Sequence, residues 1–172
     1  MKVKRKDAKS MAGKTKILSV TEKGAADVAK KLQAMDAKEP FAVLATSDNG
    51  RPYTSLISFA ITPDLKKVIF ATPKNTRKYK NLVNTGDVAI LVDNRTKKIK
   101  GLTETQAVTI LGKAAPLKRG RAWLEYAGIF LKKHPELEEF INASTTALVV
   151  IDIMSCIHVG NFQTVTVMDW DA

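Results

Sequence analysis

The residues best suited to chemistry lie in one short stretch, ATPKNTRKYKNL (71–82). Its second half predicts the start of a helix, because Asn75 or Thr76 is placed to cap one. An apolar face then recurs at helical spacing, formed by Tyr79, Leu82 and Val83. The segment before it, VIFAT, is typical of a buried strand, so the helix is expected to begin where a strand ends.

Three cations crowd the amino end of this helix: Lys74, Arg77 and Lys78. The helix dipole and the unpaired backbone N–H groups already make that end positive, so cations there are unfavourable. A bound phosphate reverses the balance, because it accepts hydrogen bonds from backbone N–H groups, from Thr76 and from both neighbouring cations. The sequence predicts a phosphate-binding site here, with a solvated basic face as the alternative.

No other group of residues has the spacing of a catalytic or metal site. His134 precedes Pro135 at a helix start and is expected to be a cap or surface residue, and His158 a packed or edge residue of a strand. With Cys156 they have no zinc-ligand spacing, and no nucleophile elbow is present. Trp123 and Tyr126 are expected to be core or dimer contacts. We predict no metal site and name no catalytic residue.

Composition narrows the class of protein. The chain has 172 residues, of which 45% are hydrophobic, as expected for one globular domain. The longest apolar run, ALVVI (147–151), is far too short to span a membrane. Cys156 is the only cysteine, which excludes an intrachain disulfide and indicates a reducing cytoplasm.

The net charge of +11 is unevenly distributed. Residues 1–16 hold seven of the 28 lysines and arginines against Asp7 alone, which leaves about half of the excess for residues 17–172. The sequence predicts a basic, flexible tail over 1–16 and a single folded domain over 17–172. Such a tail can attract polyanions non-specifically, but a solvated arm is the simpler reading, and nucleic acid is not an expected partner.

The first part of the domain predicts a helix followed by a β-meander. Residues 21–36 form an amphipathic pattern with Thr21 as its cap. Three strands follow, joined by connections too short for crossover helices, so they must pair antiparallel. They are expected at 41–46, 53–61 and 68–72, with an Asn-Gly turn between the first two.

The second part predicts more strands, interrupted by helices. Strands are expected at 88–93 and 106–116, separated by a polar loop over 94–105, and at 147–154 and 156–170. Between them, 117–134 predicts a helix and Pro135 starts a shorter one. Six or seven strands with few helices favour a closed, mainly β (α+β) barrel, since closure removes exposed edges.

The stretch VLATSDNGRPYTSLISFAITPDLKKVIFATPKNTRKYKNLVNTGDVAILVD (43–93) resembles the FMN-binding split-barrel family, typified by pyridoxamine 5′-phosphate oxidase. The resemblance covers residues 40–116 well. It implies a six-stranded antiparallel Greek-key split β-barrel with flanking helices. It also implies a homodimer that holds one FMN in each of two clefts at the subunit interface.

The resemblance also implies which residues bind FMN. Arg77 and Lys78 would hold the phosphate and Thr76 would add a hydroxyl. On the following helical turn, Asn81 is a weaker candidate. The remaining cofactor contacts would come from two strand segments, through their backbones at 56–59: Leu56, Ile57, Ser58, Phe59, Ala71 and Thr72.

In the oxidase, a glutamine of the fifth strand reaches the partner's flavin. Gln106 lies near that position, whereas counting back from Gly112 indicates Ala107. The oxidase also has an arginine where this chain has Leu56, and an Arg-x-His element near its carboxyl end, whereas no arginine follows Arg121 here. We therefore expect the flavin cradle without the vitamin B6 clamp.

The expected function is that of a flavoprotein oxidoreductase with an unidentified small-molecule substrate or electron donor. The flavin supplies the redox chemistry, and the protein binds and orients it. Three alternatives stay open at this point: a non-catalytic flavin storage, delivery or sensing module, a deazaflavin-binding barrel, and a haem-binding barrel.

Overall fold

The computed structural model describes residues 17–18, 22–94, 105–160 and 164–169. The predicted basic tail, the Thr21 cap and most of the polar loop lie outside the described residues. None of the described helices is long and apolar enough to cross a membrane.

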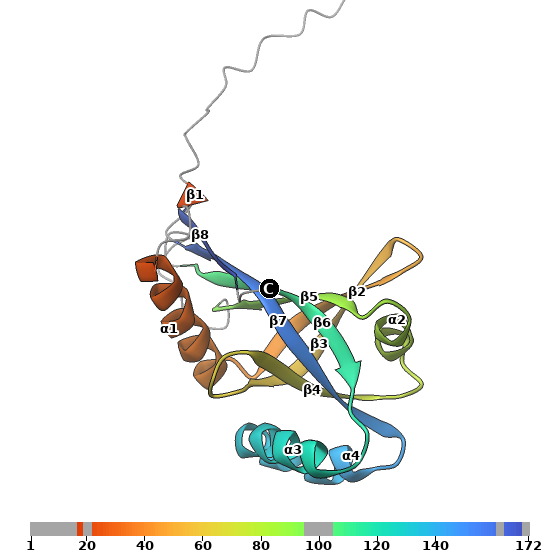
Figure 1. Cartoon of the computed structure of the whole chain (residues 1–172). Coiled ribbons are helices and arrows are strands. Elements are labelled where there is room, and N and C mark those ends of the chain that lie inside the picture. Colours follow the sequence, from red (N-terminus) through yellow and green to blue (C-terminus); the bar gives the residue numbers. More distant parts are fainter. Residues whose placement is uncertain (1–16, 19–21, 95–104, 161–163, 170–172) are drawn as a thin grey trace, which may run out of the picture.

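The described elements follow the chain as strands with helices between them (Figure 1). The helices are α1 (Glu22–Lys38), α2 (Arg77–Thr85), α3 (Arg121–Lys133), the single 3₁₀ turn η2 (Pro135–Leu137) and α4 (Glu138–Asn142). The strands are β1 (Ile17–Leu18), β2 (Phe41–Asp48), β3 (Arg51–Ile61), β4 (Lys67–Pro73), β5 (Asp87–Asp93), β6 (Ala107–Pro116), β7 (Thr146–Gly160) and β8 (Thr164–Asp169).

Six of these strands close into an antiparallel barrel in the order β2-β3-β4-β7-β6-β5, with β5 returning to β2. The consecutive strands β4 and β5 are not neighbours, so the chain crosses between them through α2 and gives a Greek key. The predicted mainly β split barrel is confirmed. Outside the barrel, β8 pairs with the second half of β7, and β1 pairs with β8 in parallel.

The meander predicted over 41–73 is confirmed, and its register explains the core. Alternate residues of β3 face inward, so that Ile57, Phe59 and Ile61 are buried while Leu56 is exposed. The cross-strand pairs Val43–Leu56 and Phe59–Phe70 lock β2 and β4 to β3. With this register, Leu56 and Ser58 of β3 face outward, where a ligand on the outer surface of the barrel could contact them.

The two final strands expected at 147–154 and 156–170 are wrong in their boundaries. A single strand, β7, runs through Ser155 to Gly160, and β8 begins only at Thr164. The register shifts between Leu111 and Gly112 of β6, so that Met154 has no partner and bulges out of β7. At Gly112 a side chain would lie 2.3 Å from the Asp152 carbonyl oxygen, so only glycine permits this close approach.

The helices cover different sides of the barrel (Figure 1). Helix α1 closes one end with Val28, Leu32 and Met35, which join the main core inside the barrel. A second core lies outside the wall, where Trp123, Phe130 and Ile141 of α3 and α4 pack on β4 and β7. Helix α2 lies on the opposite side of the barrel from α1, so the two ends of the molecule are built by different elements.

Candidate functional site

Helix α2 begins at the predicted position, and its cap is Thr76 rather than Asn75. The Thr76 hydroxyl accepts from Tyr79 N at 3.4 Å and donates to Pro73 O at 2.8 Å. The Thr72 hydroxyl lies 3.1 Å from it, which links the end of β4 to the start of the helix. Gly86 ends the helix with a positive φ of 71°, a conformation that favours glycine. The cation-bearing turn is thus fixed at both ends.

The predicted apolar face of α2 is only partly correct. Leu82 is buried, but Val83 is exposed and Asn81 is buried in its place. The Asn81 amide donates to Thr46 Oγ1 at 3.0 Å, which fastens α2 to β2. The Asn81 amide therefore contacts β2 and does not point toward the predicted cofactor site.

The first turn of α2 has the properties of an anion site. It contains no acidic residue, and within the described part of the chain the backbone N–H groups of Arg77 and Lys78 have no acceptor. These groups are among the unpaired donors of a helix start. Since the dipole adds positive potential at the same point, the turn presents two N–H donors and cationic side chains with no acidic residue among them.

Each of the three cations currently rests on a neutral group. Lys78 Nζ donates to the Leu56 carbonyl at 2.9 Å, and the Arg77 guanidinium lies 5.0 Å from the Tyr53 ring centroid. Lys74 Nζ donates to Ser144 O at 2.8 Å. Burial lowers the pKa of Lys78. A carbonyl or an aromatic ring binds a cation more weakly than a phosphate does, so an anion could displace them.

The predicted strand residues lie beside this turn. The Lys78–Leu56 bond joins the α2 turn directly to segment 56–59, while Ala71 and Thr72 lie near the end of the adjacent strand β4, just before Pro73. Ile57 and Phe59 point into the core, so only their backbones can face a ligand, whereas Leu56 and Ser58 point outward. The structure therefore brings the predicted cofactor residues together along one side of the barrel, with Asn81 turned to β2.

An apolar surface adjoins the turn. Phe41, Leu56 and Leu111 are exposed on the outer wall. Phe41 and Leu56 lie on the neighbouring strands β2 and β3, and Leu111 lies on β6, which β5 separates from β2. A hollow of about 290 Å³ opens there between Phe41, Val43 and Leu56. An apolar patch of this kind, beside a charged cleft, is typical of a protein interface. We call it the outer apolar face.

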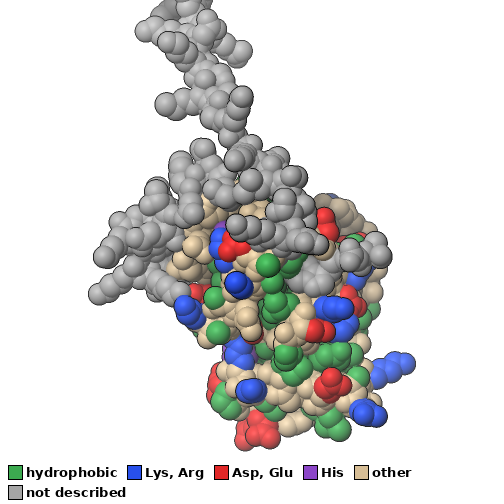
Figure 2. Space-filling view, turned by 60° about the vertical axis from the view of Figure 1, so that its left-hand side comes forward, with side chains coloured by type: hydrophobic (Ala, Val, Ile, Leu, Met, Phe, Trp, Pro, Cys, Tyr) green, Lys and Arg blue, Asp and Glu red, His purple; other side chains and the backbone are tan. Residues whose placement is uncertain are grey.

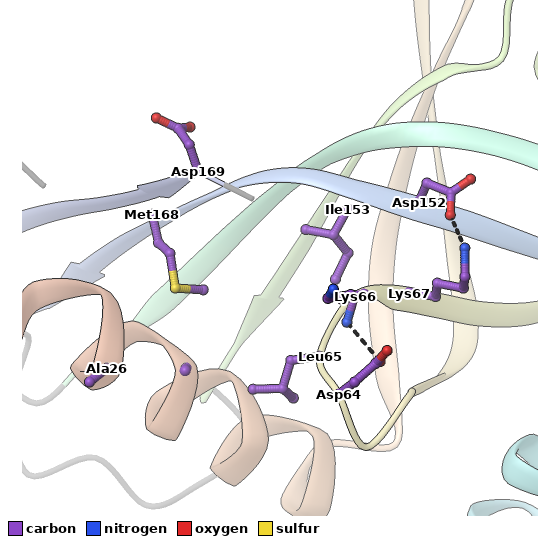
Figure 3. Close-up of a pocket in the computed structure, with 10 residues that line it drawn as sticks. Ala26, Asp64, Leu65, Lys66, Lys67, Asp152, Ile153, Met168 and Asp169 are labelled. Atoms are coloured by element: carbon purple, nitrogen blue, oxygen red, sulfur yellow. Dashed lines mark hydrogen bonds and ion pairs between the residues drawn. The ribbon is translucent and has the colours of Figure 1, made fainter. Parts of the chain in front are cut away.

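A larger cavity, of about 640 Å³, lies on the α1 side of the barrel. Figure 3 shows Leu65, Ile153 and Met168 turned toward α1, so its floor is apolar. Three of its charged side chains are engaged: Lys67 pairs with Asp152, and Asp64 accepts from Lys66 N at 3.1 Å. None of the predicted cofactor residues lines it. Although this cavity is large, its lining does not indicate a phosphate-binding site.

His134 was predicted to be a cap or a surface residue. It caps a helix, but it is not at the surface. Its backbone caps the end of α3, but its ring is buried, with Nε2 2.9 Å from the Phe59 carbonyl oxygen. Helix α3 covers this end of β3 and brings the ring to a carbonyl beyond the start of β2. No local pattern signals a contact between residues 75 positions apart.

The other histidine and the cysteine are closed to solvent. His158 is buried on β7, and burial raises the pKa of the Cys156 thiol to about 12, so it stays protonated. Trp123 is a core residue, as expected. The sequence analysis did not identify Tyr53, whose ring contacts the Arg77 guanidinium, or Thr46, whose hydroxyl accepts from Asn81. The only local signal was that both lie toward the ends of paired strands.

Comparisons with known structures find the same fold in proteins of low sequence identity. A haem-binding protein from Mycobacterium smegmatis matches with a TM-score of 0.73 and 15% identity over 82% of this chain and 57% of that one. HutZ, the haem storage protein of Vibrio cholerae, matches with a TM-score of 0.64 and 17% identity over 72% and 88%. An FAD-binding protein from Mesorhizobium loti matches with a TM-score of 0.62 and 13% identity over 82% and 94%.

A comparison with curated protein sequences finds no match. The family model described as pyridoxamine 5′-phosphate oxidase, in contrast, matches residues 28–154. That range runs from α1 through most of β7 and includes every predicted cofactor residue. With the Greek-key barrel and the cationic turn between β4 and β5, this match identifies the chain as a member of the pyridoxamine 5′-phosphate oxidase family.

Proposed function

We propose that this protein is a homodimeric FMN-binding flavoprotein that acts as an oxidoreductase on a small-molecule substrate. The observation that carries the proposal is the first turn of α2, where the cations Arg77 and Lys78 and their two unengaged N–H groups meet without an acid, whereas Lys74 lies before the helix and donates to Ser144 O. A phosphate monoester matches this arrangement in charge and in hydrogen-bonding capacity.

The residues present fit FMN. Arg77 and Lys78 would hold its phosphate, with their own N–H groups behind them, and the Thr76 and Thr72 hydroxyls lie at the same strand end. The backbone of 56–59, together with Ala71, would line the ribityl chain and ring. When bound, FMN supplies hydride or electron transfer. The protein's share is to orient the ring and to exclude water, so no side chain is assigned a catalytic role.

The proposed dimer rests on the outer apolar face. Phe41 and Leu56 expose about half of their surfaces or more, which is costly unless a partner covers them. Because Leu56 also bonds Lys78, a partner seated on this face would border the cofactor cleft. A second copy could then contribute residues to the flavin ring, with Ala107 at the start of β6, and Gln106 before it, as the nearest counterparts of the oxidase glutamine.

A second candidate is haem binding, because two of the similar structures are described as haem-binding and haem storage proteins. Haem iron needs an axial ligand, most often histidine. In the described part of the chain the His134 ring is held to Phe59 and His158 is buried, so neither imidazole is available at the surface. This favours FMN over haem. Deazaflavin, and a flavin storage or sensing role, would use the same phosphate turn.

We also propose a cytoplasmic location, which rests on the single, buried cysteine. Nucleic acid and membranes are not proposed partners. The folded part of the chain carries only a modest positive charge, and its cations at α2 converge on one turn rather than forming a stripe.

The test is to identify the small molecule that copurifies with the protein, by its absorption spectrum and mass. FMN released on denaturation, one per chain, is the expected result, with a dimer in sedimentation analysis. A Soret band would instead establish haem, and a deazaflavin mass would replace FMN. Bound FMN that no nicotinamide donor reduces would support a storage or sensing role over an oxidoreductase.

A further inference from the structure

Two residues of α2, one helical turn apart, contact the same pair of strand residues. The Arg77 guanidinium carbon lies 5.0 Å from the Tyr53 ring centroid, and the Asn81 amide donates to Thr46 Oγ1 at 3.0 Å. Thr46 and Tyr53 are directly opposite each other in the hairpin of β2 and β3, which lies beside α2 in Figure 1. Residues four positions apart share one face of a helix, so a single cross-strand pair holds this face of α2.

Hydrogen bonds join these contacts into one network. The Thr46 hydroxyl accepts from Asn81 and donates to the Tyr53 carbonyl oxygen at 3.4 Å. Thr46 and Asn81 are both buried, so removing the hydroxyl would take a hydrogen-bond partner from a buried amide, which costs free energy. The network therefore fixes the first turn of α2 relative to the strand that carries the Tyr53 ring.

The Tyr53 ring holds the Arg77 charge without using its hydrogen-bond donors. A guanidinium has five N–H donors, and an aromatic face attracts its charge without offering these donors a lone pair. Within the described part of the chain, the Arg77 guanidinium donates to no acceptor. Its donors are thus available for a planar, two-point contact with phosphate oxygens while the ring keeps the cation in place.

Arg119 provides a comparison within the same fold, because its contacts are those of a structural arginine. Its guanidinium carbon lies 3.7 Å from the Trp123 ring centroid. Its N–H groups also donate to the carbonyl oxygens of Ile141 and Asn142, both at 3.0 Å, and to Asn142 Oδ1 at 3.4 Å. Arg77 has the aromatic support without the acceptors, so a ligand is the expected source of acceptors there.

The surrounding charges lead to the same conclusion. Figure 2 shows the side of the molecule that carries α1, where acidic and basic side chains lie among one another. The first turn of α2 has no acidic residue, so no carboxylate of that turn competes for the Arg77 donors. A guanidinium that is already held in place loses less conformational entropy on binding a phosphate than a mobile one does.

We propose that Tyr53 and Thr46 are positioning residues of the phosphate site. The Tyr53 ring holds the Arg77 guanidinium in place for the phosphate, and the Thr46 hydroxyl, through Asn81, keeps α2 at the distance that this contact requires. Both residues act through α2 rather than on the ligand. This inference rests on the proposed FMN function and adds to it two residues that the flavin itself need not touch.

The test compares FMN with riboflavin, which lacks the phosphate, in fluorescence titrations of the full chain. Tyr53→Leu is expected to weaken FMN binding roughly two- to fivefold, the factor typical of an exposed cation–π contact, and to leave riboflavin binding unchanged. Tyr53→Phe keeps the ring and should bind both flavins as the wild type does. A side chain that served only the packing of the barrel would change both affinities together.

Three further variants test the network. Arg77→Ala should weaken FMN binding by about tenfold or more, and Tyr53→Leu added to it should cause no further loss, because the two residues act as a unit. Thr46→Val removes the hydroxyl and keeps the shape of the side chain, and it should weaken FMN binding roughly threefold more than riboflavin binding. Thr46→Ser keeps the hydroxyl and should restore FMN binding. Thermal unfolding establishes that each variant is folded.

The outcomes separate this inference from the proposed function. If Arg77→Ala weakens FMN binding selectively but Tyr53→Leu binds FMN as the wild type does, or weakens both flavins equally, the phosphate site stands and the positioning role of Tyr53 is overturned. Equal effects of Thr46→Val on both flavins would overturn the role of Thr46. If Arg77→Ala binds FMN as tightly as the wild type, the phosphate site itself is wrong, and this inference is overturned with it.

Discussion

The start of α2 treats its cations differently from other parts of this barrel, including the far end of the same helix, where Lys113 pairs with Asp87. Around α1 and α3, lysines meet carboxylates: Lys133 pairs with Asp36, Lys67 with Asp152 and Lys31 with Asp27. At the start of α2, Arg77 and Lys78 meet only a tyrosine ring and a backbone carbonyl. The fold therefore pairs its cations with acids where they stabilise structure and leaves them without acids at one turn.

The pKa directions follow the same division. Its hydrogen bond to Asp152 raises the pKa of Lys67, whereas burial alone lowers the pKa of Lys78. Lys133 is intermediate, since burial lowers its pKa and the carboxylates of Asp36 and Glu39 raise it in part. A half-buried cation without a counter-charge costs free energy in the absence of a ligand. Its presence is explained if a ligand supplies the negative charge.

The most direct test of this difference is to remove the cations at the start of α2 that have no acidic partner. Arg77→Ala combined with Lys78→Ala should weaken FMN binding by about 3 kcal/mol or more, because two charge-assisted bonds to one phosphate are lost. Fluorescence titration of the flavin measures the effect. Protein stability without flavin should hardly change, because relief of the unpaired positive charge is offset by loss of the Lys78 bond to the Leu56 carbonyl and of the Arg77 contact with Tyr53.

Lys80→Ala is the matched control, because Lys80 is exposed on the same helix and its side chain makes no hydrogen bond or ion pair in the described structure. Its effect should stay within about 0.5 kcal/mol. If the double variant bound FMN as tightly as the wild type, the phosphate would have to lie elsewhere.

Much of this division could be predicted from local sequence. The cap at Thr76, the strand before it and the cations after it are neighbours in the chain, so their arrangement follows from helix and strand periodicity alone. The contacts of Lys78 with Leu56 and of His134 with Phe59 join distant elements. They depend on how helices seat on the barrel, which no local pattern encodes.

The misplaced boundary in β7 has a different cause. Inward residues are Ile151 and Ile153 before the bulge, but Cys156 and His158 after it. The unpaired Met154 shifts the alternation by one residue, and a shift of phase in sequence resembles the end of one strand and the start of another. Only the partner strand, with Gly112 opposite the irregularity, reveals that the strand continues.

The paired end should respond to loss of an acid through stability. Asp36→Ala should lower the free energy of unfolding by about 2 kcal/mol, because it removes the ion-pair partner of a desolvated Lys133, leaving only Glu39 nearby, and leaves Ile61 N without an acceptor. Urea unfolding monitored by circular dichroism measures it. Asp152→Ala removes the acid of the exposed pair with Lys67 and should cost less than about 1 kcal/mol. Equal losses in both variants would remove the distinction between buried and exposed pairs.

The smallest effect concerns His158, a buried group near both charges of the Lys31–Asp27 pair. Neither ring nitrogen has a partner in the described structure, and burial, followed by Lys31, lowers the pKa of His158, although Asp27 acts in the opposite sense. Above the unfolded value of about 6.5 both states are neutral and the histidine contributes no pH dependence. As the pH falls below it, the unfolded chain takes up a proton that the folded chain does not, so stability is lost.

His158→Met should therefore flatten the decline in stability between about pH 7.5 and pH 5.5 and raise stability near neutral pH by about 1 kcal/mol, since it removes two unsatisfied buried polar atoms. Urea unfolding at the two pH values measures both effects. An unchanged decline would mean that the ring finds a hydrogen-bond partner as it charges. In that event His158, near α1, would also be a group that becomes charged without an acidic partner. The first turn of α2 would then differ from the α1 side only in the number of such groups.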